Sequence, residues 1–78
     1  MVTPDFFLDE FRSIFDETAP SEINMNTRFK DLSEWSSLLV LSTIVLMEES
    51  FSTSINAEQI ESSDTVNDLF KLLSSNEW

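Results

Sequence analysis

The absence of glycine is the feature that most limits what this 78-residue chain can fold into. Tight two-residue β-hairpins need backbone with a positive φ angle, which glycine adopts more readily than any other residue. Only asparagine or aspartate could stand in for it. The sequence therefore predicts α-helices joined by longer loops rather than a β-rich fold. The length fits one domain, residues 1–78, that buries roughly 60% of the surface of its unfolded chain.

Cysteine and histidine are also absent, which removes several classes of chemistry. Without cysteine there is no disulfide, no thiolate metal site and no cysteine nucleophile. Without histidine the chain lacks the commonest general base and metal ligand, and serine-protease-type catalysis is excluded. A calcium-binding EF-hand needs a glycine in its loop, so it is excluded as well. We expect no metal site.

The charge of the chain restricts its partners, because the sequence has 15 acidic and only four basic residues and a formal net charge of −11. Such a surface repels nucleic acid and anionic membranes, and it attracts basic protein surfaces. The first twenty residues are acidic, unlike a signal peptide, and the uncharged run over residues 35–47 is too short to span a bilayer. We expect a cytoplasmic protein with no nucleic-acid or membrane partner.

The first predicted helix begins at Thr3, a good N-cap residue, with Pro4 at the first helical position. Apolar residues recur along it with helical spacing, and we expect it to end near Thr18, before Pro20. Residues 19–36 follow as a long loop. Its apolar side chains have no regular period, so we expect them to pack over the core: Ile23, Met25, Phe29, Leu32 and Trp35.

The second predicted helix, residues 37–51, carries two apolar stripes where a surface helix needs only one. The first stripe is the predicted core face and consists of Val40, Ile44, Met47 and Phe51. The second stripe is rotated away from the first and consists of Leu38, Leu41 and Val45. A second stripe indicates either a partner-binding surface or ordinary packing, and the pattern alone leaves both open.

Two shorter elements complete the predicted fold. Residues 56–62 predict a third helix of one or two turns. Ser63 or Asp64 should cap a last helix, whose final residues, 74–78, are expected to fray. The buried face of that helix should consist of Val66, Leu69, Phe70 and Leu73.

Fifteen carboxylates raise the question of a hydrolase that uses a pair of acids. Such an enzyme needs a cleft that holds two carboxylates at a set distance and raises the pKa of one of them. Four short helices leave little room for that cleft, and most acidic residues fall on predicted polar faces. We therefore expect that this chain is not an enzyme.

Two adjacent serines, Ser36 and Ser37, open the second predicted helix. Capping is the simplest interpretation, since serine is among the commonest N-cap residues. A hydroxyl at a helix start also lies near unpaired backbone N–H groups and the positive end of the helix dipole, which would stabilise a phosphodiester attached there. The residues themselves leave both roles open for Ser37.

The order and spacing of several short motifs resemble the acyl carrier protein family. The motifs are Phe-x-Asp-Leu at 29–32, Trp-Ser-Ser-Leu at 35–38, Glu-Glu-Ser-Phe at 48–51, Thr-Val at 65–66 and Asp-Leu-Phe-Lys-Leu-Leu at 68–73. In that family the serine of an Asp-Ser-Leu motif lies fourteen residues before a core phenylalanine, as Ser37 does before Phe51. The resemblance covers nearly the whole chain. It implies an all-α, acyl-carrier-like four-helix bundle with a long first loop and a short third helix.

The resemblance also implies a function. In this family the serine carries a 4′-phosphopantetheine arm, which a phosphopantetheinyl transferase attaches from coenzyme A. The thiol of the arm holds acyl or aminoacyl groups as thioesters and presents them to loading ligases and transferases with basic docking surfaces. By this resemblance the arm belongs on Ser37, and the protein acts as a monomer. The partner enzymes would contact Leu38, Leu41, Val45, Glu48 and Glu49 on the second helix.

Two departures from the family pattern affect this expectation. The family has aspartate before the attachment serine, in the region that the transferase recognises, and this chain has Ser36. Acidic residues usually line the outer face of the second helix, where Leu39 and Ser42 stand here. The reduced acidic face favours a dedicated partner over a general fatty-acid synthase. The missing aspartate leaves an alternative, an unmodified acyl-carrier-like interaction module that binds a basic partner protein through its second helix.

Overall fold

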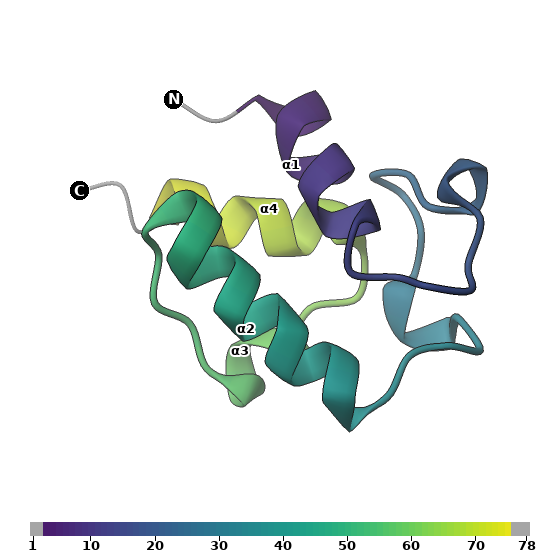
Figure 1. The fold of residues 1–78 in the computed structure, drawn as a ribbon. Coiled ribbons are helices and arrows are strands. Elements are labelled where there is room, and N and C mark those ends of the chain that lie inside the picture. The colour runs from purple at the N-terminus through teal and green to yellow at the C-terminus, as the bar shows by residue number, and fades with distance from the viewer. Residues whose placement is uncertain (1–2, 76–78) are drawn as a thin grey trace.

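The computed structural model describes residues 3–75, and all regular secondary structure within this range is helical (Figure 1). The α-helices are α1 (Pro4–Arg12), α2 (Ser37–Phe51), α3 (Ala57–Glu61) and α4 (Val66–Ser75). Two 3₁₀ turns, η1 (Pro20–Glu22) and η2 (Phe29–Asp31), interrupt the long loop between α1 and α2. The predicted all-α bundle with a long first loop and a short third helix is confirmed. The predicted fraying concerns residues that lie largely outside the described range.

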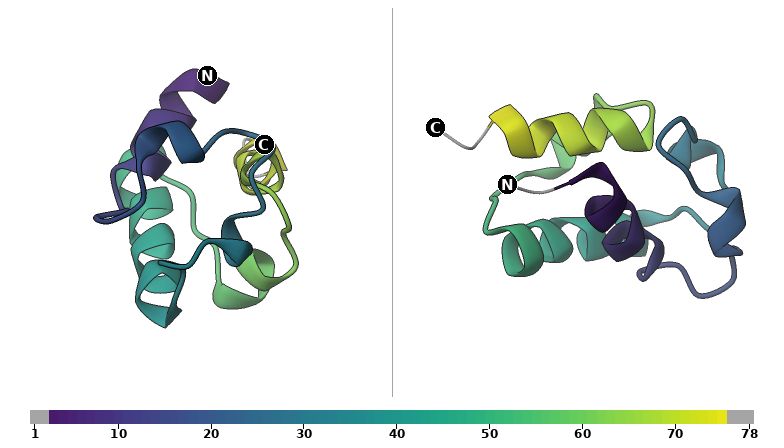
Figure 2. Two further views of the ribbon diagram at one scale, coloured as in Figure 1. Left: turned by 90° about the vertical axis from the view of Figure 1, so that its right-hand side faces the viewer. Right: turned by 90° about the horizontal axis from the view of Figure 1, so that it is seen from above.

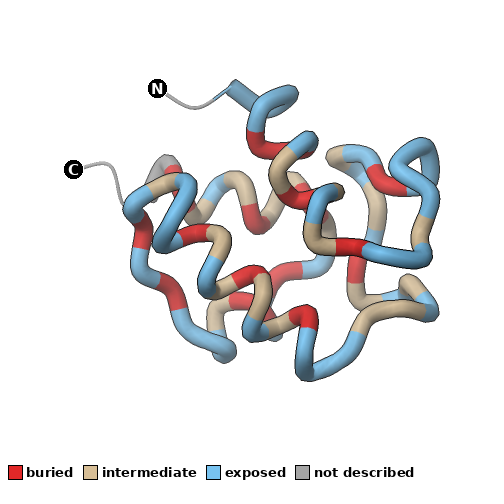
Figure 3. The backbone as a smooth tube through the Cα atoms, in the orientation of Figure 1, coloured by how far each residue is buried: buried red, intermediate tan, exposed pale blue. Residues whose placement is uncertain are grey.

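The core lies between the four helices and the long loop. Helix α1 packs against both α2 and α4, and α3 packs against α2 (Figures 1 and 2). Buried positions occur on every helix and in the loop (Figure 3). Each large side chain that becomes fully buried contributes about 1.5–3 kcal/mol to folding. The fully buried apolar side chains are Phe7, Phe11, Ile23, Phe29, Met47, Ile60, Val66 and Leu69.

Helix α1 begins as predicted, with the Thr3 hydroxyl accepting a hydrogen bond from the first turn, but it is shorter than predicted. It ends at Arg12 rather than near Thr18. The backbone N–H groups of residues 16–18 donate to the carboxylate of Glu34 instead of to the preceding helical turn. A long-range contact therefore takes the donors that a longer helix would need.

The long loop packs over the core, as the sequence predicts for residues 19–36. Its carbonyl groups accept hydrogen bonds from the start of α4. The Val66 N–H donates to the Thr27 carbonyl oxygen at 3.1 Å, and the Asn67 N–H donates to the Met25 carbonyl oxygen at 2.9 Å. The first N–H groups of a helix have no partner within it, so the loop supplies what the helix lacks.

The core face of α2 differs from the predicted one. Of the predicted residues only Met47 is fully buried, while Val40, Ile44 and Phe51 are half-buried. Leu39 and Thr43 are buried in their place, so placing Leu39 on the outer face was wrong. The Thr43 hydroxyl donates to the Leu39 carbonyl oxygen at 2.8 Å. Because this bond satisfies the hydroxyl, threonine can occupy an apolar core.

Helix α4 is capped by a different residue from the two predicted. The Thr65 hydroxyl accepts the Asp68 N–H at 3.2 Å, and the Asp68 carboxylate accepts the N–H groups of Thr65 and Asp64 at 3.1 and 2.9 Å. These backbone hydrogen bonds lower the pKa of Asp68. Ser63 instead donates its hydroxyl to the Gln59 carbonyl oxygen. The predicted buried face is confirmed at Val66, Leu69 and Leu73, whereas Phe70 is half-buried.

Candidate functional site

The first turn of α2 presents two exposed serines. Ser37 is the first residue of the 15-residue helix, and Ser36 occupies the N-cap position with an extended backbone. The Ser36 carbonyl accepts the first helical hydrogen bond, from the Val40 N–H at 3.1 Å, but its side chain makes no capping bond. The first turn also contains no acidic residue. The positive end of α2 therefore faces solvent next to the Ser37 hydroxyl, without a carboxylate to compete for it.

The residues just before α2 are held by a carboxylate that the sequence analysis missed. Glu34 accepts the N–H groups of Asp16, Glu17 and Thr18 at 2.7, 3.0 and 2.9 Å, and the Thr18 hydroxyl at 2.8 Å. We call this set of four hydrogen bonds the Glu34 clasp. Partial desolvation raises the pKa of Glu34, but the hydrogen bonds from Asp16, Thr18 and Glu17 outweigh it and lower the pKa below its ordinary value.

Glu34 does not replace the aspartate that the family has before its attachment serine. Both carboxylate oxygens of Glu34 accept hydrogen bonds from residues 16–18, so the group is engaged within the protein. No local sequence pattern indicates this contact, because the partners lie 16 to 18 residues apart.

Trp35 forms the second attachment of this segment to the core. Its ring meets the Phe29 ring edge-on at a centroid distance of 4.8 Å, and it stacks on the Phe15 ring at 6.3 Å. The side chain is half-buried. The expectation that Trp35 packs over the core is confirmed, and the ring lies two residues before Ser37.

All five predicted docking residues of α2 face solvent. The apolar ones are 70% exposed at Leu38, 60% at Leu41 and 50% at Val45, and we call them the exposed strip. Glu48 and Glu49 are exposed as well. The second stripe is therefore not packed in the core, and its role as a partner-binding surface stays a prediction.

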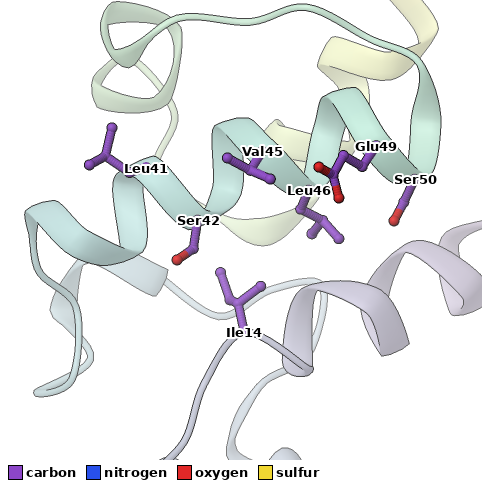
Figure 4. Close-up of a pocket in the computed structure, with 7 residues that line it drawn as sticks. All are labelled: Ile14, Leu41, Ser42, Val45, Leu46, Glu49 and Ser50. Atoms are coloured by element: carbon purple, nitrogen blue, oxygen red, sulfur yellow. The ribbon is translucent and has the colours of Figure 1, made fainter.

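An open groove of about 370 Å³ runs between α2 and the turn that follows α1 (Figure 4). Figure 4 shows Ile14 pointing from that turn toward Ser42 and Leu46 of α2. Ile14 is half-buried and lines the groove, a position that the sequence does not reveal because the predicted first helix continues past Ile14 to Thr18. The groove joins Ile14 to two residues of the exposed strip, and its lining residues are Ile14, Leu41, Ser42, Val45, Leu46, Glu49 and Ser50.

The charge around the groove is negative. Helix α2 contains two acidic residues and no basic one. At the C-terminal end of the groove the Ser50 hydroxyl donates to the Glu10 carboxylate at 3.2 Å, which brings an acidic side chain of α1 beside it. Three of the four basic side chains pair with carboxylates outside α2, in the ion pairs Arg12–Asp9, Arg28–Asp31 and Lys30–Asp64.

Comparison of the chain with protein-family models, curated proteins and solved structures gives no match. Within residues 3–75 no group of three or more acidic side chains is arranged to hold a metal ion. Each helix in the described range is too short or too polar to cross a membrane. The relation to acyl carrier proteins therefore stays a prediction from motif order and spacing.

Proposed function

We propose that this chain is a carrier protein with a 4′-phosphopantetheine arm on Ser37. The observation that carries the proposal is the exposure of Ser37 at the first residue of α2, fourteen residues before Phe51. The Phe51 ring packs against the Phe7 ring of α1 at a centroid distance of 5.5 Å. The two residues of the motif thus lie at opposite ends of α2. Ser37 offers an accessible hydroxyl at the start, and Phe51 contacts α1 at the end.

The chemistry required of this chain is limited to presenting a hydroxyl. In the active site of a transferase, the Ser37 oxygen would bond to the phosphorus that carries the pantetheine half of coenzyme A. The adenosine 3′,5′-bisphosphate half would leave, and the serine proton would pass to a base of the transferase. The resulting anionic phosphodiester would lie at the start of α2, where the helix dipole stabilises a negative charge by about 0.3–1 kcal/mol.

The exposed strip and the adjacent acidic residues would dock the partner enzymes, which include the modifying transferase and the acyl- or aminoacyl-loading ligases. Full burial of a leucine or valine side chain contributes about 1.5–3 kcal/mol. An exposed ion pair contributes only about 0.2–1 kcal/mol. The apolar contacts of Leu38, Leu41 and Val45 would therefore supply most of the affinity. Glu48 and Glu49 would mainly select partners with basic surfaces and speed their association.

The test is a mass measurement on the intact protein after incubation with coenzyme A and a broad-specificity phosphopantetheinyl transferase. We expect the mass of one arm to be added to the wild-type protein and to Ser36→Ala, and nothing to be added to Ser37→Ala. A wild-type protein that gains no mass with any of several transferases would count against the proposal.

The alternative is an interaction module without an arm. Ser36 favours it, since the family has an aspartate there for the transferase to recognise. The exposed strip is equally compatible with it, because docking through Leu38, Leu41 and Val45 needs no modification. Protein purified from its own source would decide between the two. An unmodified Ser37, together with full activity of Ser37→Ala in the cell, would favour the module.

A further inference from the structure

The start of α2 differs from the starts of the other helices in what fixes it. Each of the other three has a side chain that accepts a hydrogen bond from its own first turn: Thr3, Asn56 and Thr65. Ser36 makes no such bond at the start of α2. Besides the packing of the buried face of α2, the contacts that can fix its first turn are therefore those made by the chain before the helix.

The Glu34 clasp and the Trp35 ring supply these contacts. Three successive backbone N–H groups, from residues 16–18, converge on the single carboxylate of Glu34. Successive N–H groups in a turn form a concave site for an anion, and this site is filled by a carboxylate of the same chain. Phe15, next to these residues, stacks on Trp35. The hydrogen bonds to Glu34 and the ring contact between Phe15 and Trp35 thus attach residues 15–18 to residues 34–35.

Only Trp35 and Ser36 separate Glu34 from Ser37, so little chain remains in which a displacement of Glu34 could be absorbed. The same docked segment, residues 15–18, directly follows Ile14, which forms the wall of the groove opposite α2. The Glu34 clasp therefore holds the segment just before α2 and also the segment that follows Ile14 in the wall of the groove.

From this arrangement we infer that Glu34 is a positioning residue for Ser37, which it holds in place through its hydrogen bonds to residues 16–18. The part of the inference that concerns modification rests on the proposed function. Loss of the clasp frees residues 34–36, and the Ser37 hydroxyl then spends less time where a transferase docked on α2 would need it. Glu34 touches no reacting group, so its effect on modification is indirect.

The first test measures the effect of Glu34 on the surroundings of Ser37 by NMR, without any transferase. In Glu34→Gln we expect the amides of residues 16–18 to lose protection from hydrogen exchange, and the amide resonances of Ser37 and Leu38 to shift. Glu22→Gln is the matched control, because it removes the same charge from an exposed site in the same loop. A Glu34→Gln protein whose Ser37 and Leu38 resonances coincide with those of the wild type would overturn the inference.

The second test measures the rate at which a transferase modifies Ser37 in the variants. We expect Glu34→Gln to lower kcat/KM for Ser37 modification about tenfold with the KM for coenzyme A unchanged, since a displacement of about 1 Å can cost up to about 100-fold. Thr18→Val, which removes only the hydroxyl bond, should have a smaller effect, and Thr18→Ser should restore the wild-type rate. Ile60→Val, a destabilising change in the buried side of α3, should leave the rate unchanged while the protein stays folded.

The two tests separate the inference from the proposed function. A wild-type protein that no transferase modifies contradicts the proposed function, while the NMR comparison still decides whether Glu34 positions Ser37. A rate loss of equal size in Glu34→Gln and Ile60→Val would show that general destabilisation explains the effect, and it would overturn a specific role for Glu34 in modification.

Discussion

The starts of α2 and α4 show two ways to fix the beginning of a helix. Helix α4 has a local cap, made of reciprocal hydrogen bonds between Thr65 and Asp68, besides the long-loop carbonyls that accept its first N–H groups. Helix α2 has no such bond, and the residues just before it, Glu34 and Trp35, contact distant parts of the chain. The difference leaves the first turn of α2 open to solvent, where a phosphate-linked group would need room and free N–H donors.

The largest effect should come from removing the long-range support of α2. Trp35→Ala loses the ring contacts with Phe15 and Phe29, and we expect it to cost about 2–3 kcal/mol, below the ~3–5 kcal/mol of a fully buried aromatic residue. Urea unfolding followed by circular dichroism measures this loss. Leu38→Ala, at an exposed site in the first turn of α2, is the control and should stay within about 0.5 kcal/mol of the wild type. Equal losses in both variants would show that the ring contacts of Trp35 give α2 no specific support.

The local cap of α4 should give an intermediate effect. Thr65→Ala removes the acceptor for the Asp68 N–H and should cost about 1 kcal/mol. Thr65→Ser keeps the hydroxyl and should recover most of that loss. If Thr65→Ala unfolds at the same urea concentration as the wild type, α4 is not fixed by its own cap and the contrast with α2 fails.

The sequence predicts well those features that depend on nearby residues. Thr3 and Pro4 predict the start of α1, and the absence of glycine predicts the helical class. Apolar spacing over residues 37–51 predicts α2 with the observed bounds. The sequence prediction fails where hydrogen bonds that apolar spacing does not reveal decide the structure, either between distant residues or within one helix. Beyond the end of α1 the N–H groups of residues 16–18 bond to Glu34 instead of extending the helix. The buried Thr43 hydroxyl bonds to the Leu39 carbonyl within α2, which hydrophobic spacing does not register.

The candidate site divides in the same way. Helical periodicity separates Leu38, Leu41 and Val45 from the predicted core face but leaves their role open, and the structure exposes all three. Ile14 and the Glu34 clasp lie between α1 and α2, where the chain has left the helical path that apolar spacing extends to Thr18. Sequence spacing thus gives the part of the site that one helix carries, and it misses the part that two segments build together.

The two anchoring carboxylates, Glu34 and Asp68, should make both helix starts sensitive to acid. Hydrogen bonds lower the pKa of each group in the folded protein below its ordinary value, 4.5 for Glu34 and 3.8 for Asp68. Their contribution to stability is therefore fully present above those values, and it is lost as the pH falls through the lower pKa values of the folded state. Thermal unfolding from neutral pH downward should show Tm falling less steeply in Glu34→Gln and in Asp68→Asn than in the wild type. An unchanged slope in either variant would mean that its carboxylate does not anchor its helix start.

The smallest expected effect is the sharpest test of the comparison. Ser36 stands at the N-cap position of α2, and replacing a working serine cap by alanine typically costs about 1 kcal/mol. Because the Ser36 side chain makes no capping bond, Ser36→Ala should change the free energy of unfolding by less than about 0.5 kcal/mol, as at an ordinary surface site. Urea unfolding of Ser36→Ala beside Thr65→Ala compares the two cap positions in one protein. A Ser36→Ala loss as large as that of Thr65→Ala would show that Ser36 does cap α2 in solution, and the helix would then not depend on Glu34 and Trp35 for its start.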